Sequence, residues 1–390
     1  MKHKRGLICI LILTLLFTSG CWDKIELEQR VFITAMLIDL NEEDKENKPI
    51  GSTGAFNDDM PEKLKITFGM ANPSKIQEGE NAFLIRSVTS VNATKAVEKL
   101  ATMTSRVPFY GQLRLVILTE RLVRNKETFK EILDHIERDA VINSLAKVVI
   151  FTGNPEEAFE IDPKLEILNS VYVTGIMDNS KITSETTDMT LTELLSSIRN
   201  NDGLAAVPLL EVRPQDGRGF EINRLALIKD YSLLDYLDTR YVRTYKIMNR
   251  KFKNGKKVIN YKGLEIPFVI YTMNREIWLE EGGDNLKYRV KVEVEGDIKE
   301  YSFEENLFET NTLKDIQQKI QESIKMELQE STRYFQNVIG ADYLGFGDYT
   351  NKYHNSVYKK YKENWDESFK KAEISYDVKA DIRRIGPSKK

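Results

Sequence analysis

The chain has 390 residues, a size that supports two or three domains with hydrophobic cores of their own. Its 57 Lys and Arg against 60 Asp and Glu leave it mildly acidic, which excludes the basic surface that nucleic acid requires. Two cysteines are too few for a disulfide framework.

Residues 1–20 have the pattern of a lipoprotein signal peptide. Three basic residues precede an apolar run at residues 7–17, which is shorter than the ~20 residues of a membrane-spanning helix. Ser19 and Gly20 then lead directly into Cys21. The pattern predicts cleavage before Cys21 and a diacylglyceryl lipid on its thiol, which would tether the chain to the outer face of a bacterial membrane. An uncleaved signal anchor is the alternative.

Strands and helices alternate from residue 21 to residue 185, which predicts an N-terminal α/β domain. Leu64 to Met70 alternates apolar and polar residues, the period of a half-buried strand, whereas Phe129 to Ile136 follows helical spacing. Asn154 followed by Pro155 is typical of a helix start. We expect strands at residues 31–40, 64–70, 113–118 and 148–151, and helices at residues 93–103, 129–136 and from 155 onward.

A middle domain is predicted at residues 186–254, after a stretch rich in Ser, Thr and Asp. Thr190 and Glu193 have the spacing of a capping box for a helix that continues to Ile198. A strand is expected at residues 222–228 and a helix at residues 233–246.

Residues 255–390 are predicted to form a C-terminal α+β domain. Tyr288 to Val294 alternates as a strand, a long amphipathic helix is expected from a cap at Thr312, and a last strand at residues 374–382. The whole chain is therefore expected to be a mixed α+β protein of three domains, lipid-anchored at its mature N-terminus. An aromatic stripe precedes the last strand, and packing against that strand is favoured over a partner-binding role. Its members are Tyr353, Val357, Tyr361, Trp365 and Phe369.

Residues that could catalyse a reaction or hold a metal do not cluster in the sequence. His135 and His354 are isolated within predicted helices, without a second ligand at metal-binding spacing. No nucleophile elbow, zinc-protease motif or phosphate-binding loop is present. The turn from Gly345 to Asp348 is better explained as a connection between helices than as an anion-binding loop. We expect no metal, no cofactor other than the lipid on Cys21, and no enzymatic activity.

Several short motifs follow one another along the chain. They are Cys21-Trp22-Asp23, Gly111 to Glu120, Arg224 to Asp230, Asp342 to Gly347, Trp365 to Phe369, and Ile382 to Gly386. With these motifs the chain resembles the C-subunit lipoproteins of Ger-type spore germinant receptors, the GerAC family. Gln112 departs from the His that many members have after this glycine, which fits a non-catalytic family. The candidate structural or interaction residues are Trp22, Asp23, Asp342, Gly345, Gly347, Trp365, Arg383, Arg384 and Gly386.

The resemblance implies one subunit of a three-part receptor that is required for nutrient-triggered spore germination. Its implied partners are an A subunit with several membrane spans and a permease-like B subunit, and its implied location is the outer face of the spore inner membrane. A solute-binding lipoprotein of an importer is the first alternative. A surface hydrolase is the second, and the absence of catalytic motifs disfavours it.

Overall fold

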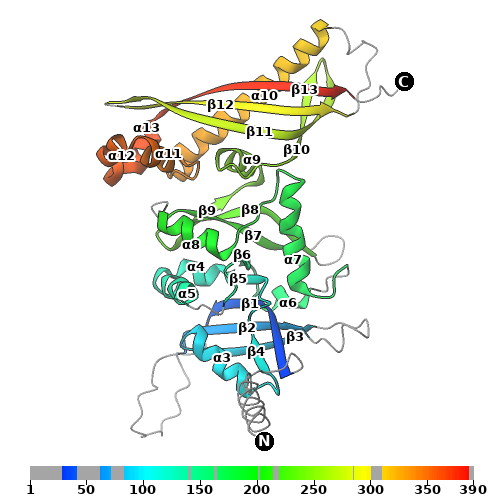
Figure 1. Ribbon diagram of the computed structural model, residues 1–390, viewed down its shortest axis with the longest axis vertical. Helices are drawn as coiled ribbons and strands as arrows, with labels where there is room; N and C mark the ends of the chain where they lie inside the picture. Colours follow the sequence, from blue (N-terminus) through cyan, green and yellow to red (C-terminus); the bar gives the residue numbers. More distant parts are fainter. Residues whose placement is uncertain are drawn as a thin grey trace, which may run out of the picture.

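The computed structural model describes residues 29–41, 62–71, 83–138, 142–161, 165–200, 203–213, 219–283, 285–299 and 310–385. Cys21, Trp22, Asp23 and Gly386 lie outside these ranges. The described chain forms an elongated molecule in which two β-sheets with their helices follow one another along the long axis (Figure 1). The strand β1 Arg30–Leu40 lies toward one end of this axis and the strand β13 Glu373–Ile385 toward the other (Figure 1).

A mixed sheet forms the first layer, and in the described residues it contains nine strands in the order β3-β2-β1-β5-β6-β7-β8-β9, with β4 beside β1. The strands β1, β5, β6 and β7 pair in parallel, and antiparallel strands extend the sheet on both sides. The bounds are β1 Arg30–Leu40, β2 Leu64–Ala71, β3 Phe83–Ser90, β4 Val107–Phe109, β5 Leu115–Thr119, β6 Lys147–Thr152, β7 Ala205–Arg213, β8 Gly219–Lys229 and β9 Ser232–Leu237.

Helices cover both faces of this sheet, so its central strands are almost continuously apolar, as parallel strands are. On one face lie α3 Ala93–Thr102, α4 Glu120–Arg124, α5 Lys126–Arg138 and α8 Leu191–Asn200. The other face is covered by α6 Glu157–Glu160 and α7 Asn169–Asp178, followed by the short helix η3 Asn179–Lys181. The predicted capping box is confirmed, since the Thr190 N–H donates to Glu193 Oε2 at 2.8 Å and the Glu193 N–H to Thr190 Oγ1 at 3.2 Å.

One prediction for the middle unit is wrong. Residues 233–246 do not form a single helix, because β9 continues to Leu237 and α9 Thr239–Met248 begins after the N-cap Asp238. The predicted boundary at residue 185 falls between β6 and β7, which are hydrogen-bonded neighbours in one sheet. The middle unit is thus joined to the first by backbone pairing, and its independence as a domain stays a prediction.

The second layer is a four-stranded sheet in the order β10-β11-β12-β13, crossed by a long helix. Tyr288, Val290, Val292 and Val294 are buried on one face of β12, as their alternation predicts. The bounds are β10 Gly255–Tyr261, β11 Leu264–Gly282, β12 Leu286–Ile298, α10 Thr310–Tyr334, η4 Phe335–Ile339, α11 Phe346–Tyr353, α12 Asn355–Tyr361, η5 Lys362–Asn364, α13 Trp365–Lys371 and β13 Glu373–Ile385.

Two predictions about helices in this layer are wrong. Thr312 is not a cap, since α10 already includes Thr310. The aromatic stripe does not lie on one helix, because α11, α12 and α13 are separate short helices. Trp365 and Phe369 are buried whereas Tyr353 is 58% exposed, so only part of the stripe packs in the core. The apolar face of β13 is covered by α10, with a Gln317 amide donating to the Ala380 carbonyl at 2.6 Å.

The two layers share one continuous core around α9. Apolar side chains from β7, β8 and α9 pack together with those of β11, β12 and α10. Within α9, Lys246 is completely buried, and its ammonium group donates to the carbonyls of Ser180, Thr183 and Thr186 at 3.1, 2.7 and 2.7 Å. Burial lowers the pKa of Lys246 to about 8, and Asp188 opposes this fall. Lys246 therefore fixes the segment after α7 onto the helix between the layers.

Replacing Lys246 by Met should lower the free energy of unfolding by about 2–5 kcal/mol, because two buried carbonyl groups and one partly buried carbonyl group would lose their donor. The measurement is urea unfolding of the unlipidated chain. Lys253→Met is the matched control, since Lys253 is exposed, and a change of no more than about 0.5 kcal/mol is expected there. Equal stability of the two variants would contradict the role given to Lys246.

Candidate functional site at the junction of the two layers

A buried carboxylate organises the loop between the long helix and α11. Asp342 is 3% exposed, and its Oδ1 accepts from the backbone N–H groups of Leu344, Gly345 and Phe346 at 3.2, 3.0 and 3.3 Å. Its Oδ2 accepts from the Gly347 N–H at 2.6 Å. The first N–H groups of a helix have no partner within the helix, and here Asp342 satisfies them for α11.

The two glycines of this loop are required by its geometry. Gly345 precedes α11 with φ +82°, a conformation that side chains with a Cβ rarely adopt. At Gly347 an added Cβ would lie 2.9 Å from the Trp365 indole nitrogen and 3.3 Å from Asp342 Oδ2. The spacing Asp-x-x-Gly-x-Gly therefore encodes one tight turn around one carboxylate.

Trp365 completes the shell around Asp342 from a distant part of the chain. Its indole N–H donates to Asp342 Oδ2 at 3.1 Å, and its ring lies 5.4 Å from the ring of Tyr358 between centroids. Trp365 begins α13, so this contact fixes α13 beside the start of α11. The expected contact of Trp365 with the last strand is replaced by this packing on the Asp342 loop.

All five donors to Asp342 are N–H groups, and a carboxylate offers about four lone-pair sites. Burial raises the pKa of the Asp342 carboxyl, while the N–H groups of Gly347, Phe346, Trp365 and Gly345 oppose the rise. Because the carboxylate is enclosed and its acceptor capacity is used by its own chain, Asp342 has no capacity left for a substrate. It is a structural centre.

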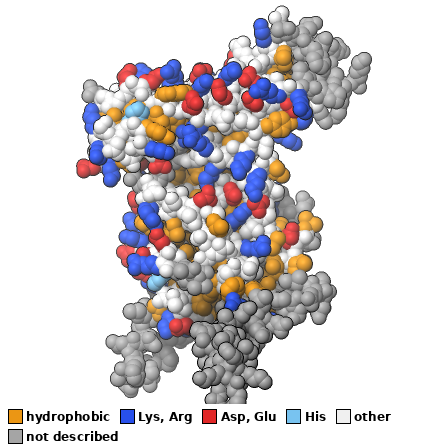
Figure 2. Space-filling model, viewed as in Figure 1, with side chains coloured by type: hydrophobic (Ala, Val, Ile, Leu, Met, Phe, Trp, Pro, Cys, Tyr) orange, Lys and Arg blue, Asp and Glu red, His pale blue; other side chains and the backbone are white. Residues whose placement is uncertain are grey.

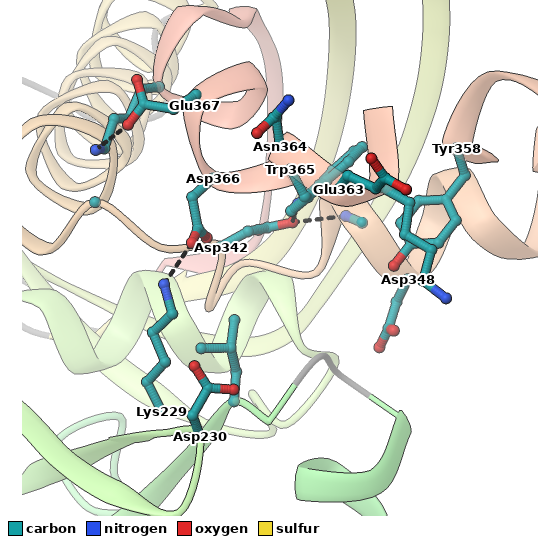
Figure 3. A pocket seen from close by; sticks show the side chains of 15 residues that line it. Lys229, Asp230, Asp342, Asp348, Tyr358, Glu363, Asn364, Trp365, Asp366 and Glu367 are labelled. Carbon is teal, nitrogen blue, oxygen red and sulfur yellow. Dashed lines mark hydrogen bonds and ion pairs between the residues drawn. The ribbon is translucent and has the colours of Figure 1, made fainter. Parts of the chain in front are cut away.

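The same loop is bound to the first sheet. The Tyr343 hydroxyl donates to the Ile228 carbonyl at 2.8 Å, and Lys229 forms an ion pair with Asp366 of α13 (Figure 3). Asn249, at the end of α9, donates to the Tyr343 carbonyl at 2.9 Å. The end of β8, the end of α9, the Asp342 loop and α13 thus meet at one junction.

A cavity of about 460 Å³ opens at this junction, and charged side chains of both signs line it. Lys229 and Lys370 are paired with Asp366 and Glu367, respectively. In the described ranges no three His, Cys, Asp or Glu side chains lie together as a metal site would require. The cavity therefore offers paired charges between two layers, an arrangement suited to holding the layers together.

Comparison with known proteins decides the family. Residues 23–212 match the family model described as the spore germination protein N-terminal domain, and residues 223–386 match the model described as spore germination B3/GerAC like, C-terminal. The chain belongs to the GerAC family of spore germination proteins. The resemblance found in the sequence motifs is confirmed.

Relatives in the GerAC family align along the whole chain. The spore germination protein YndF of Bacillus subtilis (strain 168) is 22% identical and covers 100% of this chain and 99% of its own length. Spore germination protein A3 of the same organism is 23% identical over 98% of each chain. The crystal structure of the GerBC protein matches with a TM-score of 0.57 and 17% identity, over 82% of this chain and 93% of that one. This likeness confirms the mixed α+β fold.

Three of the motifs that resembled the GerAC family meet at the junction. The strand motif ends at Lys229 and Asp230, and it faces both the Asp342 loop and the helix that begins at Trp365. Of the candidate residues, the structure brings together Asp342, Gly345, Gly347 and Trp365. It places Arg383 and Arg384 apart from them, about 33 Å along β13 from its first residue. There Arg383 forms an ion pair with Glu295.

The isolated histidines are placed differently. His135 lies on the exposed side of α5, and His354 lies between α11 and α12 with its Nε2 3.3 Å from the Tyr349 hydroxyl. Tyr343, Lys229 and Asp366 each lie within one of the sequence motifs, but they were not among the candidate residues. Lys229 and Asp366 are 137 positions apart. A single sequence carries no signal that two motifs so far apart meet through such a pair.

Asp342→Asn should lower the free energy of unfolding by about 2–5 kcal/mol, since the new NH₂ group must face N–H donors whichever way the amide is turned. Denaturant unfolding of the unlipidated chain measures this. Asp377→Asn is the control, because Asp377 is exposed on β13, and its effect should stay within about 0.5 kcal/mol. A stable Asp342→Asn chain would refute the structural role.

Trp365 separates ring packing from hydrogen bonding. Trp365→Ala should cost about 3–5 kcal/mol through the cavity it leaves. Trp365→Phe keeps one ring, loses the N–H donated to a charged acceptor and leaves a smaller cavity than Ala does, so a smaller loss of about 1.5–3 kcal/mol is expected. The same unfolding measurement ranks the two variants. A Trp365→Ala chain with wild-type stability would instead mean that the indole serves partner binding.

Proposed function

We propose that this chain is the lipid-anchored C subunit of a spore germinant receptor. In this proposal it acts without catalysis, binds the receptor's A subunit and permease-like B subunit at the outer face of the spore inner membrane, and is required for nutrient-triggered germination. The observation that carries the proposal is the match of both family models along the chain, together with a junction built from the motifs most specific to that family.

The chemistry of the junction supports a non-enzymatic role. Asp342, its most buried acid, is saturated by N–H donors of its own chain. Lys229 and Lys370, which line the same cavity, are engaged in ion pairs. A general base needs a free lone pair within hydrogen-bonding reach of a substrate, and neither group offers one. What the junction provides is a fixed arrangement of two layers, which suits a subunit that supports an assembly.

The membrane attachment rests on the leader and on Cys21. In the part of the chain that the structure describes, no helix is both long and apolar enough to cross a membrane. A thioether-linked diacylglyceryl group supplies two acyl chains, and two chains give stable attachment where one is marginal. Family membership favours this receptor role over a solute-binding lipoprotein of an importer.

Cys21→Ala should move the protein from the spore membrane fraction to the soluble fraction, or leave it as an uncleaved precursor, because the lipid site is lost. The measurement is fractionation of spores after a high-salt wash, with a germination assay on the same strain. Cys9→Ala is the matched control, since Cys9 would be removed with the leader, and it should behave as wild type.

Two outcomes would contradict the proposal. Membrane retention and an unchanged germination response in the Cys21→Ala strain would refute the lipid anchor. Failure of the epitope-tagged wild-type chain to co-purify with the A and B subunits from spore inner membrane would refute the assembly role.

A further inference from the structure

A second cleft, of about 710 Å³, lies beside α11 and includes Gly345 of the Asp342 loop in its wall. Its walls are the end of α9, the middle of β11 and the exposed side of α11. The Asp342 carboxylate fixes the start of α11, and the Arg275 guanidinium Nε donates to the Met248 carbonyl of α9 at 2.8 Å. The cleft is therefore a rigid feature whose walls are held by the core.

Three cations face this cleft without a partner of opposite charge. Among the residues that the structure describes, Arg250, Arg275 and Lys352 form no ion pair, although other surface cations such as Arg383 do. Burial, followed by the charge of Arg250, lowers the pKa of Arg275 to about 10, while Tyr376, Tyr353 and Asp342 oppose the fall. Arg250 and Arg275 thus lie close enough in this cleft for their charges to act on each other.

Two carboxylates also line the cleft, and they leave these cations unpaired. Glu276 belongs to β11 and acts on Lys291 of the neighbouring strand β12. Asp348 lies on α11 and takes part in an interaction of its own. Neither carboxylate forms an ion pair with the three cations in the described chain, so the cations remain available to an anion from outside.

Large aromatic side chains surround the same cations. Trp278 is 38% exposed and Tyr353 is 58% exposed, so both leave apolar ring surface in contact with water. The Tyr349 ring lies 5.2 Å from that of Tyr353 between centroids. Figure 2 shows apolar and basic side chains side by side at the α11 end of the C-terminal layer. Aromatic residues and Arg are the types that dominate binding energy at protein interfaces.

We propose that this cleft binds an acidic segment of a protein partner, with Arg250, Arg275 and Lys352 pairing its carboxylates and Trp278 and Tyr353 packing on its apolar side chains. A small anion would use the cations and leave the aromatic rings exposed to water. A peptide chain uses both, and the charge of the cleft selects an acidic one. This inference rests on the proposed function, because it gives the assembly subunit a specific docking surface.

Site-specific photo-crosslinking in intact spores tests the occupant. The full-length lipoprotein carries p-benzoylphenylalanine in place of Tyr353, and the crosslinked partner segment is mapped by mass spectrometry. The expected result is a segment that carries several Asp or Glu residues. Met326, 56% exposed on α10 and outside the cleft, is the matched crosslinking position and should not capture that segment. No crosslink at Tyr353, or a crosslink to a neutral or basic segment, overturns the proposal.

Charge reversal tests the role of the cations. Arg250→Glu combined with Lys352→Glu should lower the crosslinking yield at Tyr353 at least tenfold, with an unchanged unfolding midpoint because neither side chain has an ion pair to lose. Lys314→Glu with Lys325→Glu, both exposed on α10, changes the net charge equally and should leave the yield unchanged. Replacing acidic residues of the mapped segment by Lys should restore the yield with the reversed cleft. Insensitivity of the yield to charge reversal overturns the proposal.

Other ligands are distinguished with the purified full chain in detergent. Inorganic phosphate, and phosphatidylglycerol added as mixed micelles in the same detergent, are titrated separately while tryptophan fluorescence is followed in wild type and in Trp278→Phe. A Trp278-dependent signal with either probe below 1 mM would assign the cleft to a small anion or to lipid and overturn the peptide proposal. If the wild-type chain co-purifies with its partners and Tyr353 captures no acidic segment, this inference fails while the proposed function stands.

Discussion

The buried carboxylate of Asp342 is the constraint on which the C-terminal half depends. Taking a charge out of water costs several kcal/mol unless hydrogen bonds compensate it, and here five N–H groups do so. Four of them come from the loop that starts α11, and the fifth comes from the first residue of α13. One side chain thereby fixes the positions of two helices that are separate in sequence, and it does so with a geometry that only Gly345 and Gly347 permit.

The junction links this centre to the first sheet through three polar contacts, from Tyr343, Lys229 and Asn249. Because the apolar core also continues from β7 and β8 through α9 into the second sheet, the two layers are bound by both packing and hydrogen bonds. A displacement of the first layer would have to break buried contacts in the second. In the proposed receptor, the two layers of the subunit would then move as one body.

Local patterns predicted much of this fold. The capping box at Thr190, the alternation in β12 and the apolar face of α5 depend on neighbours within a few residues, and the sequence shows those neighbours. The single helix expected at residues 233–246 failed because helical spacing of apolar residues also fits a strand followed by a helix. The cap expected at Thr312 was misplaced because the long helix already includes Thr310. The continuity of the first sheet across residue 185 could not be predicted, since strand order depends on pairings between distant segments.

The residues of the candidate site were predicted through their motifs, whereas the interactions that join these residues were not. Asp342, Gly345, Gly347 and Trp365 were selected by resemblance, and only the structure shows that one carboxylate joins them. The burial of Lys246 was only weakly indicated in the sequence, by its position four residues after Val242, which places both side chains on the same helix face. Nothing in the sequence indicated that Lys229 forms an ion pair with Asp366. Interactions across more than a hundred residues follow from the tertiary fold and not from local composition.

Some charged groups in this protein are buried and hydrogen-bonded by the chain itself, whereas others face a cleft without an ion pair. This difference distinguishes the groups that stabilise the fold from those proposed to bind a partner. Asp342 and Lys246 are buried, and their hydrogen-bonding capacity is met by the chain itself, so they stabilise the fold and can offer nothing to a ligand. Arg250, Arg275 and Lys352 face a cleft and have no ion pair within the described ranges. The first group holds α9 and α11 in place, and the second group stands on or beside those same helices. A rigid frame therefore presents charges without ion pairs at a fixed spacing. Because the cleft is already ordered, binding a complementary partner would cost the receptor subunit little conformational entropy.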